Sequence, residues 1–72
     1  MSEKKFNYTI ITSSSTGRVF DKCLRDVKEK LELQTENMLK QDYKLNGSHT
    51  LQILPNLDSW IMCATQSLYK SL

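Results

Sequence analysis

The chain has 72 residues, which is enough for one domain (residues 1–72) with a small hydrophobic core. Its formal net charge is +2, and acidic and basic residues are interleaved, which excludes strong binding to a nucleic-acid backbone. No apolar stretch approaches the length of a membrane span, and no signal-peptide core is visible, so we expect no membrane contact.

The two cysteines and one histidine form neither a disulfide framework nor a zinc pattern, so no metal or cofactor is expected. Cys23 and Cys63 both lie among apolar residues, where reduced, buried thiols are typical of a cytoplasmic protein. A chain this short is marginally stable alone. We therefore expect a homo-oligomer, or a protein that binds another protein.

The first predicted element is a strand at Phe6–Thr12, where aromatic and β-branched residues are concentrated. Phe6, Tyr8 and Ile10 occupy alternate positions, so their side chains point to one face. We expect this face to pack against the helix that follows.

The stretch Thr12–Leu33 is interpreted as a hydroxyl-rich loop that leads into an amphipathic helix. Apolar residues recur at intervals of one, three and four, which places them on one side of a 3.6-residue period. This apolar stripe consists of Val19, Phe20, Cys23, Leu24, Val27 and Leu31. Ser15 or Thr16 is the expected N-cap, because a hydroxyl oxygen can accept a hydrogen bond from an amide of the first turn.

The loop before this helix is also a candidate ligand-binding site. Free amides at a helix N-terminus, the helix dipole, hydroxyl groups and a guanidinium can together hold an anion. The residues are Ser13, Ser14, Ser15, Thr16, Gly17 and Arg18. The alternative is that the hydroxyls only cap the helix. No P-loop and no dinucleotide-binding glycine motif is present.

After Leu33 the apolar pattern fits two structures. Met38 and Leu39 continue the helical period, but Leu39 also begins an alternating pattern that runs to Leu45. We favour a second strand at Leu39–Leu45 over an extended helix.

Asn46-Gly47 is the strongest turn signal in the chain. Beyond it, His49, Leu51 and Ile53 alternate with polar residues, which predicts a third strand. Only a loop of odd length places the apolar residues of both strands on one face. We therefore expect a hairpin with a three-residue loop, in which the second and third strands pair directly.

Pro55 predicts either the end of this strand or a position at the sheet edge, because proline cannot donate a ladder hydrogen bond. The last segment, Trp60–Leu72, fits a strand and also a helix capped by Asp58 or Ser59. We favour the strand, because a lone hairpin needs further partners. The predicted fold class is α+β, with one amphipathic helix packed on a small antiparallel sheet in the order βαββ or βαβββ.

This order of elements resembles the dodecin-like βαββ architecture, and also small βαββ proteins of bacterial and phage genomes. The resemblance covers most of the chain and rests on the element order and on Thr12–Ser14 at the end of the first strand. It implies a βαββ fold. In dodecins a tryptophan shortly after this turn stacks on flavin, whereas this chain has Gly17–Val19 there. Flavin binding is therefore not implied.

No sequence pattern predicts catalysis, since no motif places a nucleophile or carboxylate beside His49. We expect a non-enzymatic protein-interaction or homo-oligomeric module, such as an accessory regulator or inhibitor, because one helix covers one sheet face only. Candidate interface residues are Ile11, Trp60, Met62 and Tyr69, although Trp60 also fits a core position. The alternatives are a nucleotide or anion site at the hydroxyl-rich loop, and weak nucleic-acid binding by Lys22, Arg25 and the tyrosines.

Overall fold

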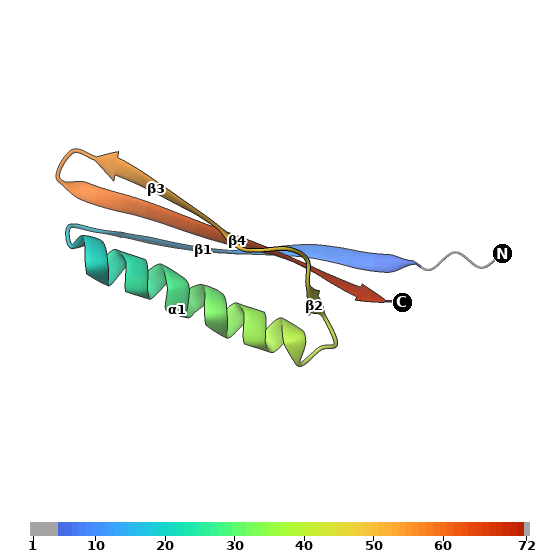
Figure 1. The fold of residues 1–72 in the computed structure, drawn as a ribbon. Helices are drawn as coiled ribbons and strands as arrows, with labels where there is room; N and C mark the ends of the chain where they lie inside the picture. The colour runs from blue at the N-terminus through green and yellow to red at the C-terminus, as the bar shows by residue number, and fades with distance from the viewer. Residues whose placement is uncertain (1–4, 72) are drawn as a thin grey trace.

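A computed structural model describes residues 5–71 of the chain (Figure 1). Within these residues it contains one helix, α1 (Phe20–Leu39), and four strands, β1 (Phe6–Gly17), β2 (Lys44–Leu45), β3 (Thr50–Asn56) and β4 (Ser59–Ser71). All strand pairs are antiparallel and α1 covers one face of the sheet, so the predicted α+β fold is confirmed. Across residues 5–71, no helix is long and apolar enough to pass through a bilayer.

β4 is the central strand and pairs with each of the other strands. β1 follows one edge of β4, from the pair Phe6–Ser71 to the pair Gly17–Trp60, without a bulge. β3 and β2 lie one after the other along the opposite edge. β1 and β3 are therefore never neighbours, and β4 is inserted between them (Figure 1).

The apolar stripe predicted from the sequence is present in α1. Cys23, Val27 and Leu31 are buried against the sheet. The helix continues to Leu39, because half-buried Thr35 extends the same face by one more turn. The predicted strand at Leu39–Leu45 is therefore wrong, except for the two residues of β2.

The hydroxyl-rich segment is a strand and not a capping loop. Residues 13–17 continue β1 and pair with β4, so the prediction that Ser15 or Thr16 caps the helix is wrong. The N-cap is Val19, which makes no side-chain cap hydrogen bond. The long partner strand β4 offers backbone hydrogen bonds to the whole segment, and the serines are used for this pairing.

Small side chains on β1 allow α1 to approach the sheet closely. The hydroxyl of Ser13 is buried and donates to the carbonyl oxygen of Val27 at 2.8 Å. A β-carbon at Gly17 would lie only 2.9 Å from the Sγ atom of Cys23. Because side chains alternate along a strand, the other set of β1 residues points away from α1. The prediction that this set packs on the helix is wrong, and it includes Phe6, Tyr8 and Ile10.

The predicted hairpin between the second and third strands is also wrong. β2 pairs Leu45 with Leu68 of β4, and β3 begins by pairing Thr50 with Thr65 of β4. Residues 46–49 therefore lie opposite a shorter stretch of β4 and form a bulge. β2, the bulge and β3 together make one interrupted edge strand.

Side chains and backbone of β4 hold this bulge in place. The buried side chain of Gln66 donates from Nε2 to the carbonyl of Gly47 at 3.0 Å. The backbone N–H of Asn46 donates to the carbonyl of Ser67 at 2.9 Å. Gly47 has a φ of 79°, which a glycine adopts without steric cost. The turn signal Asn46-Gly47 is thus used for a bulge.

The strand predicted at the end of the chain is confirmed through Ser71, and Leu72 lies outside the described residues. Pro55 belongs to β3, which lies at an edge of the sheet. Of the two predicted alternatives, the end of the strand or the sheet edge, the structure has the edge position. A tight turn joins β3 to β4 between the paired residues Asn56 and Ser59. Its residue Leu57 has a φ of 54° and a fully exposed side chain.

We expect Leu57→Gly to raise the free energy of unfolding by about 1 kcal/mol, because a side chain in the left-handed region costs about 1–2 kcal/mol. The higher entropy of a glycine in the unfolded chain offsets part of this gain. Urea unfolding at one fixed protein concentration measures the change. Leu57→Ala keeps the positive φ and should stay within about 0.5 kcal/mol of wild type. Equal effects of the two substitutions would contradict the explanation.

Candidate interaction surface

The sheet face opposite α1, here called the open face, is covered by no element of the described chain (Figure 1). Most of its side chains come from alternate positions of β1, β3 and β4. They are Phe6, Tyr8, Ile10, Thr12, Ser14 and Thr16 of β1, Thr50, Gln52 and Leu54 of β3, and Ile61, Cys63, Thr65, Ser67 and Tyr69 of β4. β2 adds Lys44, opposite Tyr69, so this face carries one charged residue at its paired positions, whereas α1 carries many.

Aromatic rings cluster at one end of the open face. The rings of Phe6 and Tyr69 meet edge to face with centroids 5.8 Å apart, and the Tyr8 ring lies 6.2 Å from Phe6 and 6.4 Å from Tyr69. Tyr8 exposes 64% of its surface, and the neighbouring Ile10 exposes 68%. Exposed aromatic side chains of this kind are typical anchors of protein–protein interfaces.

The middle of the open face is a row of small polar side chains. Thr12, Thr65 and Thr50 lie in register across the three strands, and the hydroxyls of Thr50 and Thr65 are hydrogen-bonded to each other. Ser14 and Cys63 form the next pair along the sheet. These groups can form hydrogen bonds, but none is a carboxylate or imidazole suited to general acid–base catalysis. The row is suited to contact with another surface.

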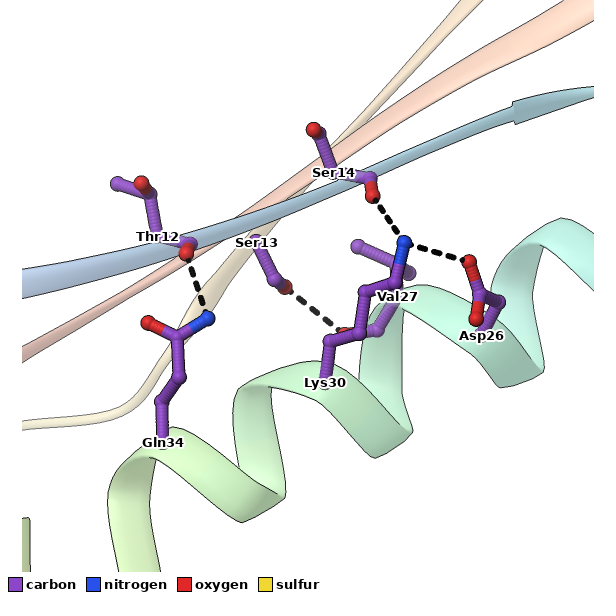
Figure 2. A network of polar contacts seen from close by, with 7 residues as sticks. All are labelled: Thr12, Ser13, Ser14, Asp26, Val27, Lys30 and Gln34. Atoms are coloured by element: carbon purple, nitrogen blue, oxygen red, sulfur yellow. Dashed lines mark hydrogen bonds and ion pairs between the residues drawn. The ribbon is translucent and has the colours of Figure 1, made fainter. Parts of the chain in front are cut away.

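Side chains of α1 reach the outer edge of β1 (Figure 2). Nε2 of Gln34 donates to the Thr12 carbonyl at 2.9 Å, and Nζ of Lys30 donates to the Ser14 carbonyl at 3.2 Å. Both carbonyls point away from β4, and such outward groups recur at every second residue of an antiparallel edge strand. The equivalent groups of Phe6–Ile10 receive no side-chain donor within residues 5–71.

Lys30 also forms an ion pair with Asp26, with 2.9 Å between Nζ and Oδ2. The Lys30 ammonium, together with the Ser15 hydroxyl, holds the pKa of Asp26 below its ordinary value of 3.8. A carboxylate whose pKa is lowered by folding stabilises the fold above its unfolded-state pKa. This stabilisation is lost as the pH falls through the lower, folded-state pKa.

The residues predicted to bind an anion lie on two sides of the sheet. Ser13 and Ser15 face α1, whereas Ser14 and Thr16 belong to the open face, and Figure 2 shows Ser13 and Ser14 pointing in opposite directions. The hydroxyl of Ser13 is buried in its bond to the helix. These hydroxyl groups therefore do not converge on one point.

Of the remaining residues of the predicted anion site, Gly17 is the last residue of β1 and Arg18 follows it in the turn to α1. Arg18 forms an exposed ion pair with Asp58, at 3.4 Å. A hollow of about 290 Å³ beside this turn is lined by Arg18 and Lys22, but also by the carboxylate of Asp26. The acidic side chain reduces the positive charge that an anion would meet.

The four predicted interface residues lie in different parts of the molecule. Tyr69 lies on the open face. Met62 is 0% exposed in the core, so it has no surface with which to contact a partner. Ile11 packs against the core on the helix side, and Trp60 packs edge to face on Phe20 with centroids 5.1 Å apart. The exposed apolar residues of β1 were missed because their alternation was assigned to the helix side.

A further hollow, of about 450 Å³, lies between α1 and the bulge. Glu32 and Glu36 of α1 line one wall, His49 of the bulge lines another, and Gln66 of β4 also contributes. The sequence contains no signal for this hollow. The hollow depends on the bulge at residues 46–49, where the sequence pattern predicts a hairpin turn. Within residues 5–71, no group of three or more metal-binding side chains is clustered.

The residues considered for nucleic-acid binding lie on different sides of the molecule. Tyr8 and Tyr69 share the open face, whereas Lys22 and Arg25 belong to α1, which covers the opposite face. A single strand could not stack on these rings and contact these cations at the same place.

Comparisons with known proteins found no relative of this chain. No protein-family model, curated protein or solved structure matches the chain. The function is therefore inferred from the open face and the edge of β1.

We expect Asp26→Asn to make the free energy of unfolding less dependent on pH below about pH 4, because it removes a carboxylate whose pKa is lowered on folding. Urea unfolding at a series of pH values measures this dependence. Asp21→Asn is the control, since Asp21 lies on the same helix and forms no ion pair within residues 5–71. The explanation is wrong if Asp26→Asn and wild type lose stability equally on acidification.

Proposed function

We propose that the protein is a non-enzymatic interaction module that forms a homo-oligomer through the open face of its sheet and the adjoining edge of β1. The observation that carries this proposal is the open face, which is uncharged over β1, β3 and β4 and exposes Tyr8, Ile10 and Leu54. Exposed apolar groups gathered on one uncovered sheet face, here at its two ends, are typical of a surface that contacts a partner.

The size of the exposed surface supports the same proposal. The chain exposes 5629 Å², whereas a compact monomer of 8.4 kDa exposes about 4,600 Å². Its radius of gyration is 15.1 Å, against about 11 Å for a compact domain of 72 residues. The excess surface of about 1,000 Å² agrees with a sheet that has one uncovered face.

The chemistry of the open face supports a non-enzymatic role. Its polar groups are hydroxyls, the thiol of Cys63, the carboxamide of Gln52 and the ammonium of Lys44. A cysteine nucleophile needs a base within hydrogen-bond reach. His49 lines the hollow against α1, on the other side of the sheet from Cys63. The open face therefore presents a surface for contact without an activated nucleophile.

Light scattering during gel filtration, and native mass spectrometry, test the proposal on the purified wild-type protein. We expect a mass that is a multiple of the 8.4 kDa chain and that falls on dilution, because the interface equilibrium depends on concentration. A mass of 8.4 kDa at every concentration up to the millimolar range would contradict the proposal.

Ile10→Lys should shift this equilibrium towards the monomer, because it places an unpaired ammonium in an apolar contact. Asn37→Lys is the matched control, since Asn37 is exposed on α1, on the other side of the sheet. It introduces the same charge and should leave the mass unchanged. Circular dichroism of both variants establishes that the fold is retained.

A further inference from the structure

The outer edge of β1 is divided into two parts. At Thr12 and Ser14, side chains of α1 occupy the outward carbonyl groups. The other part, Phe6–Ile10, extends past the end of α1 (Figure 1), and its outward backbone groups accept no bond from the described chain. A free row of N–H and C=O groups is a template for pairing with another strand.

This free part of the edge lacks the features that usually prevent strand pairing. β1 contains no proline and no charged residue, and its pairing with β4 has no bulge. The opposite edge of the sheet differs in these respects, because it is interrupted by the bulge at residues 46–49 and carries Pro55 in β3. Phe6–Ile10 is therefore the stretch of sheet edge best able to accept a further strand.

We propose that Phe6–Ile10 pairs with the same segment of a second copy of this chain, antiparallel, about a two-fold axis at Tyr8. This inference rests on the proposed function, that the chain associates with itself, and specifies where the two copies meet. Tyr8 then lies opposite Tyr8, and Phe6 opposite Ile10. Because these residues carry the outward backbone groups, each of these pairs exchanges two backbone hydrogen bonds.

The register follows from the limits of the free edge. Pairing cannot continue through Thr12, because Gln34 already occupies its outward carbonyl. The free outward groups belong to Phe6, Tyr8 and Ile10, and this set is symmetric about Tyr8. Two identical segments that pair antiparallel over their full length must therefore be centred there.

A second copy is favoured over an unrelated strand because the segment complements itself. In this register each apolar residue that the free segment contributes to the open face meets another, and the aromatic clusters of both copies lie side by side. No charged side chain of β1 is brought opposite a like charge. The two sheets then form one continuous sheet, and the open faces join into one larger face.

Substitutions at the axis test the pairing, because the two copies of residue 8 lie directly opposite each other. We expect the wild-type mass to be an even multiple of the chain mass, and Tyr8→Lys or Tyr8→Glu to halve it, since like charges oppose each other across the strands. An equimolar mixture of the two variants should regain the wild-type mass as a mixed oligomer. Asn37→Lys is the matched control, since it introduces the same charge at an exposed position of α1, on the other side of the sheet from the open face.

Cysteine cross-linking tests the register independently. Directly opposed residues in a hydrogen-bonded pair have Cα atoms about 5.5 Å apart, within the range of about 4.4–6.8 Å for disulfides. In a Cys63→Ser background, Tyr8→Cys should give a covalent dimer on oxidation. Ile10→Cys should not, because the two introduced thiols would lie about 13 Å apart along the strands.

The outcomes separate the two proposals. A wild-type protein that is monomeric overturns the proposed function and this inference together. A wild-type oligomer that keeps its mass in Tyr8→Lys, and that gives no selective cross-link through Tyr8→Cys, overturns the inference and leaves the proposed function in place. Halved masses, recovery on mixing and a cross-link at position 8 alone support the inference.

Discussion

The close contact between α1 and the small residues of β1 determines which side chains of this protein remain exposed. The hydroxyl of Ser13 bonds to the helix backbone, and Gly17 leaves room for the sulfur of Cys23. Because side chains alternate along a strand, this choice of face sends Phe6, Tyr8 and Ile10 to the other side of the sheet. The tight, partly polar contact with the helix and the exposure of these apolar residues on the open face therefore have a single cause.

Local signals predicted the elements that depend on local structure. The 3.6-residue stripe located the buried face of α1. The residues after Ser59 fitted a strand and a helix alike, and the strand that forms β4 was favoured because the sheet needed further partners. The errors arose where the structure of a segment depends on residues far away in the sequence. The serines after Thr12 were assigned to a helix cap, and the residues around Gly47 were assigned to a hairpin. Both segments pair with β4 instead, and this pairing has no local sequence signature. Because Phe6, Tyr8 and Ile10 were assigned to the helix side of the sheet, most residues of the open face were not predicted. Tyr69 is the one predicted interface residue that lies on this face.

The two edges of the sheet are protected by different means. One edge is distorted by a bulge, which the buried carboxamide of Gln66 anchors through bonds to the carbonyls of Gly47 and Ser67. The other edge is straight, and it is shielded where the amide of Gln34 and the ammonium of Lys30 reach over it from the helix. Shielding by side chains extends only as far as the helix does, so the length of α1 sets the length of edge that stays available.

The position of β4 in the chain has a consequence for how the protein is made. Every strand pair in the sheet includes β4, and β4 is the last of the four strands to leave the ribosome. Until it emerges, β1 and the nascent helix have no ladder to join, and the aromatic residues of β1 remain accessible to chaperones. Folding must therefore wait for nearly all of residues 5–71 to be synthesised, and the long sequence separation between β1 and β4 favours slow formation of the sheet.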